Sequence, residues 1–139
     1  MKKIALLILA FLLLPFQSFA KLPQPEYVSM KKISAICGLG EVLGCMTHKP
    51  FKIYIYWKIQ MDKKLKDKIY WHEVGHYLTG NWERKDFIKK LGFADINEND
   101  VITLSEKMAN LYEDYKTIGI KDKKAIKVFK QLEKSNIFK

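Results

Sequence analysis

The chain has 139 residues, a formal net charge of +10, and hydrophobic side chains at 48% of its positions. This length fits one compact domain and excludes two domains with separate cores. The positive charge fits contact with an anionic surface through the lysines, and we expect a monomer.

Residues 1–20 have the three parts of a secretory signal peptide. Two lysines follow the first methionine, an apolar run extends from Ile4 to Phe16, and small residues mark the end. The apolar run is shorter than the roughly 20 residues that span a bilayer. We therefore predict cleavage after Ala20, one mature domain of residues 21–139, and a periplasmic or secreted location. Export argues against nucleic acid as a partner.

The first part of the mature chain is predicted to be extended and then held by one disulfide. Pro23 and Pro25 forbid a regular helix, and regular structure is expected from about Val28. An even number of cysteines in an exported chain predicts that Cys37 pairs with Cys45 and closes a glycine-rich loop.

The clearest strand pattern spans Phe51 to Ile59, where the sequence FKIYIYWKI alternates isoleucine with tyrosine. The segment from Gly44 to His48 is expected to pair with it, through a turn at Lys49 and Pro50. These two segments predict a short antiparallel sheet.

Helical patterns occupy the rest of the chain. One helix is predicted from a cap at Asp62 to about Thr79, where Gly80 follows. Further helices are predicted at residues 83–91, 103–117 and 122–134, with an acidic connector at residues 95–100. The last two helices are expected to bury Leu104, Met108, Leu111, Tyr112 and Tyr115, and Ala125, Val128, Phe129 and Leu132, respectively. Strands followed by helices predict the α+β class with a single domain.

The first of these helices carries the sequence His72-Glu73-Val74-Gly75-His76, which reads HExxH. Residues four apart lie on one face of a helix, so both imidazoles can bind one metal ion with Glu73 beside it. The motif resembles the signature of the zincin metallopeptidases. That resemblance implies that His72 and His76 bind one Zn²⁺ per chain and that Glu73 is the general base.

A catalytic zinc usually has a third protein ligand. No histidine follows His76, and Thr79 and Trp82 stand where the metzincin pattern requires glycine and histidine. The chain then offers as third ligand Glu106, Glu113 or His48.

Glu106 and Asn110 are four residues apart and therefore share a helix face. This spacing resembles the gluzincin pattern, in which a glutamate ligand is followed by a residue that orients a zinc-bound histidine. The resemblance implies that Glu106 is the ligand and that Asn110 orients His72. A different reading stays open, because Thr103 and Glu106 also match a capping box, which needs no metal.

The size of the chain resembles that of the minimal gluzincin-like peptidases, in which a strand before the active-site helix binds the substrate backbone as an edge strand. Residues 51–59 are expected in that place. Many gluzincins also use a histidine or tyrosine to stabilise the oxyanion. Tyr112, Tyr115 and His48 are the candidates here.

These features together predict an exported zinc metallopeptidase, an endopeptidase acting on peptide or protein substrates. The bound zinc is expected to activate water, with Glu73 accepting its proton. The alternative is a cationic periplasmic or surface-binding protein without catalytic activity, whose zinc is structural or absent.

Overall fold

The computed structural model describes residues 22–79 and 101–134, apart from the side chains of residues 101–104. Its elements are β1 (Glu26–Val28), α2 (Met30–Cys37), β2 (Gly44–His48), β3 (Phe51–Tyr56), the 3-10 helix η1 (Trp57–Ile59), α3 (Lys63–Thr79), α5 (Val101–Thr117) and α6 (Lys123–Lys134). The predicted signal peptide, the helix at 83–91 and the acidic connector lie outside the described residues.

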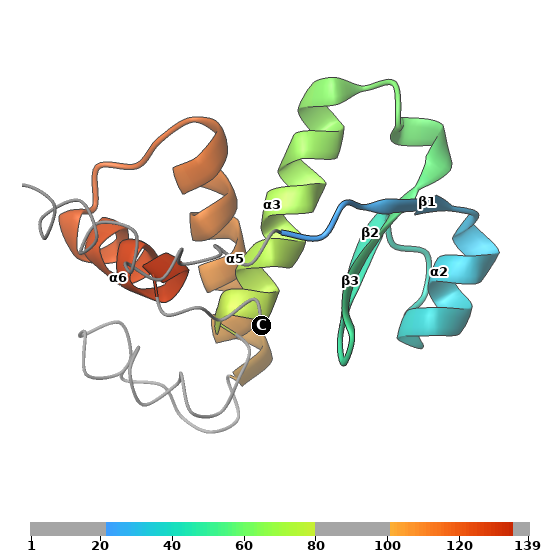
Figure 1. Cartoon of the computed structure of the whole chain (residues 1–139), viewed down its shortest axis with the longest axis horizontal. Helices are drawn as coiled ribbons and strands as arrows, with labels where there is room; N and C mark the ends of the chain where they lie inside the picture. The colour runs from blue at the N-terminus through green and yellow to red at the C-terminus, as the bar shows by residue number, and fades with distance from the viewer. Residues whose placement is uncertain (1–21, 80–100, 135–139) are drawn as a thin grey trace, which may run out of the picture.

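The architecture is α+β, as predicted, and α3 lies at its centre (Figure 1). A three-stranded sheet packs against one side of α3, and α5 packs against its other side. Helix α6 covers α5, while α2 covers the face of the sheet that is turned away from α3. None of the described helices is both long enough and apolar enough to cross a membrane.

The sheet corrects the prediction that residues 51–59 form an edge strand. Strand β3 is central, because β2 pairs with it antiparallel and β1 pairs with it parallel. The extended segment after Pro25 forms β1. No local sequence pattern predicts that β1 pairs with β3. Strand β3 also ends at Tyr56, where η1 begins. The sheet is therefore mixed, and the antiparallel edge strand is β2.

Helix α2 was not predicted, although its boundaries follow ordinary rules. Ser29 accepts a hydrogen bond from the Lys32 backbone N–H at 3.3 Å, and Gly38 ends the helix with a φ of 63°. Ile33 is its one fully buried side chain and packs with Tyr54 against the sheet. This packing explains why both faces of β3 are buried.

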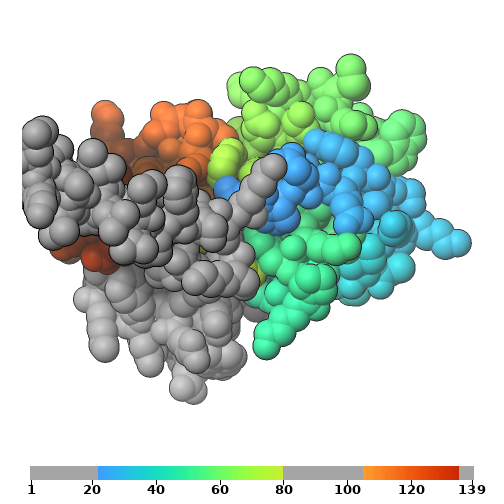
Figure 2. Space-filling view, viewed as in Figure 1, coloured from blue at the N-terminus to red at the C-terminus, as the bar shows by residue number. Residues whose placement is uncertain are grey.

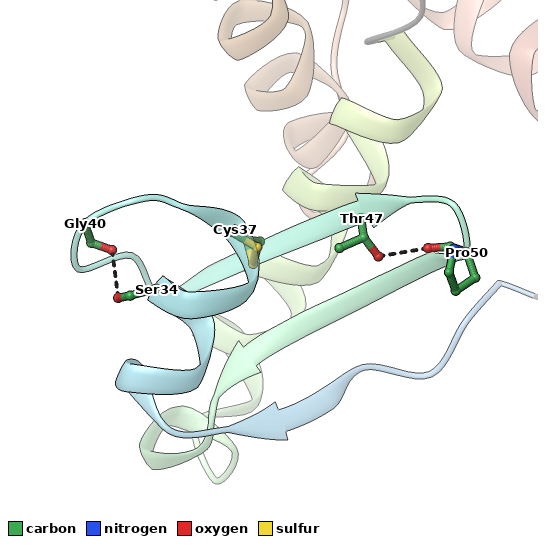
Figure 3. The surroundings of a disulfide bond; sticks show 6 residues. Ser34, Cys37, Gly40, Thr47 and Pro50 are labelled. Carbon is green, nitrogen blue, oxygen red and sulfur yellow. Dashed lines mark hydrogen bonds between the residues drawn. A yellow bond between two sulfur atoms is a disulfide. The ribbon is translucent and has the colours of Figure 1, made fainter.

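The predicted disulfide between Cys37 and Cys45 is confirmed (Figure 3). It joins the end of α2 to β2, so it fixes a helix to the sheet as well as closing the loop between them. The Ser34 hydroxyl of α2 donates a hydrogen bond to the Gly40 carbonyl of this loop at 3.4 Å. The disulfide therefore fixes the base of the loop, and this hydrogen bond fixes its middle.

Helix α3 begins at Lys63, directly after the predicted cap at Asp62. The Asp62 carboxylate accepts a hydrogen bond from the Leu65 backbone N–H at 3.0 Å, which caps the first turn. Val74 and Leu78 are fully buried, and they share one core cluster with Met108 and Tyr112 of α5.

Helix α6 follows a cap at Asp122, whose carboxylate accepts hydrogen bonds from the backbone N–H groups of Lys124 and Ala125. The four residues predicted to be buried in α6 are all buried: Ala125, Val128, Phe129 and Leu132. In α5, Met108 and Tyr112 are buried, and Leu111 and Tyr115 are partly buried against the same core.

Helices α3 and α5 lie very close together at Gly75. A Cβ atom at this position would lie 2.8 Å from the Ala109 Cα and 3.1 Å from the Ala109 carbonyl oxygen. Both contacts are with backbone atoms, so no side-chain rotation relieves them. Gly75 therefore sets the distance between the two helices that carry the HExxH motif and Glu106.

We expect Gly75→Ala to destabilise the protein by about 1–2 kcal/mol, because overpacking at the backbone outweighs the gain in helix propensity. Gly40→Ala is the matched control, since no atom lies within 4 Å of a Cβ there. The free energy of unfolding of each variant is measured by denaturant titration. Equal stability of the two variants would show that the helices separate at no cost.

Candidate metal centre

His72 and His76 of α3 face Glu106 of α5, and each of the three offers a ligand atom within 4.8 Å of the others. The Glu106 Oε2 atom lies 3.4 Å from the His72 Nε2 atom, and Oε1 lies 3.2 Å from the His76 Nε2 atom. The carboxylate therefore lies between the two imidazoles. Of the three residues that the sequence offered as third ligand, Glu106 completes this cluster.

The three residues could hold a metal ion, and their donor set is one that zinc accepts. Zinc binds histidine nitrogen and carboxylate oxygen at roughly 2.0–2.2 Å, so tetrahedral ligand atoms are about 3.3 Å apart. The two separations between Glu106 and the histidines, 3.4 and 3.2 Å, agree with that spacing. Two imidazoles and one carboxylate also form a donor set known from catalytic zinc sites, where a fourth position holds water.

The capping-box reading of Glu106 does not hold in the structure. Helix α5 begins at Val101, so Thr103 lies inside the helix rather than at its cap. Glu106 is half-exposed in the second turn of α5, and its carboxylate points toward the histidines. The contact between Gly75 and Ala109 explains this placement, because it brings the two helices together beside the cluster.

The other nitrogen of each imidazole also has a partner on α5. The His76 Nδ1 atom lies 3.0 Å from the Ser105 hydroxyl oxygen. The His72 Nδ1 atom lies 3.6 Å from the Glu113 Oε2 atom, and Glu113 is in turn 3.6 Å from the Lys68 ammonium. These contacts orient both rings, because a group beside the second nitrogen fixes which nitrogen is free to bind a metal.

The structure does not give Asn110 the orienting role that the resemblance implied. Asn110 is exposed, and among the described residues it makes no hydrogen bond to either histidine. At 3.6 residues per turn, Glu113 returns to within about 20° of the direction of Glu106, whereas Asn110 is about 40° away. Glu113 therefore takes the place beside His72.

Glu73 lies beside the cluster, with 8% of its surface exposed. Burial, and next the charge of Glu106, raise the pKa of the Glu73 carboxyl to about 7. A Cβ added at Gly44 of β2 would lie 3.5 Å from the Glu73 carboxylate, so this carboxylate is close to the edge strand. Glu73 is thus a buried carboxyl group at the boundary between α3 and the sheet.

The pKa of Glu73 predicts how pH affects the metal-free protein. Its pKa is raised in the folded state from 4.5 to about 7, so the folded protein loses stability as pH rises through this range. Glu73→Gln removes this loss. We expect the variant to match the wild type near pH 4 and to be more stable by about 3 kcal/mol at pH 8. Urea titrations of the metal-free proteins at both pH values measure the difference, and a constant difference would contradict it.

His76 is held in the form that binds metals. Burial, and next the charge of His72, lower the pKa of the His76 imidazole, while Glu106 opposes them. A neutral imidazole has a free electron pair for a metal ion, whereas a protonated one does not.

The cluster opens into a cleft of about 880 Å³. The cleft is bounded by the loop before β2, by β2 itself, by one face of α3, and by Ser105, Glu106 and Glu113 of α5. This volume is within the range of small-molecule and peptide sites. His72, Glu73 and His76 all line it.

Of the three oxyanion candidates, His48 alone lines the cleft. Tyr112 and Tyr115 lie on the face of α5 that packs against Phe129 of α6. The Tyr112 hydroxyl donates to the Glu133 carboxylate at 2.8 Å. These two tyrosines therefore belong to the core between α5 and α6, away from the residues that line the cleft.

Comparison with known proteins gives no match: no family model, no curated protein and no solved structure corresponds to this chain. The assignment of the centre therefore depends on its geometry and chemistry.

Proposed function

We propose that the protein is an exported zinc-dependent peptidase that hydrolyses peptide bonds. The observation that carries the proposal is the convergence of His72, His76 and Glu106 in an open cleft, with the buried Glu73 beside them. The disulfide between Cys37 and Cys45 supports a location outside the cytosol.

A zinc ion bound at this centre supplies a Lewis acid, which polarises the substrate carbonyl and lowers the pKa of water. The Glu73 carboxylate accepts a proton from the attacking water and then delivers it to the leaving amine. Its burial suits this role, because a carboxyl pKa near 7 balances the acceptance and release of a proton at neutral pH.

Strand β2 supplies the binding surface for the substrate backbone. It pairs with β3 along one edge, and within the described chain its other edge has no partner strand. All five residues of β2 line the cleft. An extended peptide can therefore add to this edge by main-chain hydrogen bonds, with its scissile bond near Glu73. The substrate-binding strand is thus β2, and not the segment 51–59.

Two measurements on one sample test the proposal. We expect one zinc per chain by elemental analysis, and cleavage of an unfolded, reduced protein that stops with a chelator and returns with one equivalent of zinc. Peptide products are identified by mass spectrometry. Bound zinc without cleavage of a peptide library would indicate a binding protein with a structural zinc, and a protein with no affinity for zinc would refute the centre.

A further inference from the structure

Four exposed apolar side chains lie on two segments that adjoin each other at the end of β3. Five large hydrophobic residues are exposed in the described chain, and Trp57 and Met61 are 52% and 93% exposed. Leu39 and Leu43 are also exposed, on the loop before β2. The fifth, Ile118, lies apart from these at the end of α5.

The topology of the sheet brings together the segments that carry these residues. The Tyr56 backbone N–H donates to the Leu43 carbonyl at 2.9 Å, so the loop before β2 adjoins the residues after β3. Val28 pairs with Tyr56, so the start of α2 reaches the same end of the sheet. Figure 2 shows the blue atoms of β1 and the start of α2 next to the green atoms of η1 and α3.

Exposed lysines occur on the same segments as these apolar residues and at the start of α2. Residues 29–32, 39–43 and 57–64 hold five lysines and two carboxylates, a formal charge of +3. The lysines are all exposed: Lys31, Lys32, Lys58, Lys63 and Lys64. One of the two carboxylates, that of Asp62, caps α3. We call the four apolar residues and these five lysines the basic end face.

We infer that the basic end face docks the protein onto an anionic lipid surface. Tryptophan favours the boundary between headgroups and acyl chains, and nearby lysines are attracted to anionic headgroups. The apolar residues project from a loop and a turn, which suits insertion between headgroups. Lys58 lies 5.9 Å from the Trp57 ring, so cation and ring reach the surface together.

Docking at this face also determines where the cleft lies. Leu39 and Leu43 belong both to the basic end face and to the wall of the cleft. Binding to a membrane therefore brings the cleft close to the lipid surface. Docking itself does not depend on zinc or on hydrolysis, so it can be measured whether or not the peptidase proposal holds.

The test is sedimentation with two kinds of vesicle. One is phosphatidylcholine alone, and the other also contains about 30% phosphatidylglycerol, so the two differ in surface charge. The exported protein is used, with its N-terminus verified by mass spectrometry. We expect binding to the anionic vesicles and much weaker binding to the neutral ones. Absence of binding to the anionic vesicles would overturn the inference.

Two triple variants of equal charge decide whether this face is responsible. Replacing Lys58, Lys63 and Lys64 by glutamine should weaken binding at least about tenfold, since each lysine near the surface contributes roughly fivefold. The matched control replaces Lys124, Lys127 and Lys130 of α6, which are also exposed. Equal losses in the two variants would show that net charge alone drives binding and would overturn the inference.

The apolar contribution is tested in the same assay. Trp57→Ser should weaken binding at least about fivefold, because a buried tryptophan contributes strongly at an interface. Ile118→Ser is the control, since Ile118 is 74% exposed but lies away from the basic end face. Thermal unfolding verifies that every variant is folded. Unchanged binding of Trp57→Ser would exclude docking at this face.

Discussion

Glu73→Gln will bind zinc as the wild type does and will hydrolyse peptides about 10²- to 10⁴-fold more slowly, the usual contribution of a positioned acid–base group. Glutamine has the shape of glutamate but cannot accept a proton. It fits the same buried position beside Gly44, so the ligands His72, His76 and Glu106 keep their places. The measurement is kcat/KM on a fluorogenic peptide, with zinc content determined on the same preparation.

A matched substitution separates this effect from a general change of charge. Glu41→Gln removes the same charge from an exposed residue that does not line the cleft, and its kcat/KM should be unchanged. An inactive preparation that is purified in the same way shows that the turnover does not come from a contaminating peptidase. Full turnover by Glu73→Gln would show that another group accepts the proton, and His48, which also lines the cleft, would then be a candidate.

Local signals in the sequence predicted much of the fold. The cap predicted at Asp62 forms, and the helix predicted from Asp122 begins one residue later, with Asp122 as its cap. The periodic apolar residues of α6 predicted its buried face, because helical spacing alone determines that face. These features depend on residues a few positions apart, and such interactions are visible in a sequence.

The errors concern interactions between distant segments. The alternation of residues 51–59 identifies a strand, but its position in the sheet depends on β1, a three-residue segment that pairs with it in parallel. Tyr54 lies on the face of β3 that α2 covers. Neither contact leaves a pattern within the strand itself, so the central position of β3 was not predictable from its residues.

The same distinction applies to the metal centre. His72, Glu73 and His76 are one local motif, and the sequence identifies them directly. The neighbours of the imidazoles depend on how α5 is rotated and shifted against α3, which the contact at Gly75 decides. Ser105 gave no signal in the sequence, and Glu113 was considered only as a ligand. Both are found once the two helices are placed together.

The second large expected effect is on zinc affinity. It distinguishes three residues of α5 by their positions on the helix. Glu106→Ala should lower zinc affinity by at least about 100-fold, because it removes a direct ligand, and partners of ligands already contribute 10- to 100-fold. Glu113→Ala should lower it by about tenfold, since Glu113 only orients His72. Asn110→Ala should leave it unchanged, because Asn110 contacts neither histidine in the described chain.

Competition with a chromophoric chelator measures the three affinities, and thermal unfolding of the metal-free proteins serves as the control for folding. Glu106 is half-exposed, and alanine is favourable in a helix, so its loss should not unfold the protein. The order of the three effects is the decisive result. A larger loss for Glu113→Ala than for Glu106→Ala would transfer the ligand role to Glu113, and it would require α5 to lie in a different register against α3.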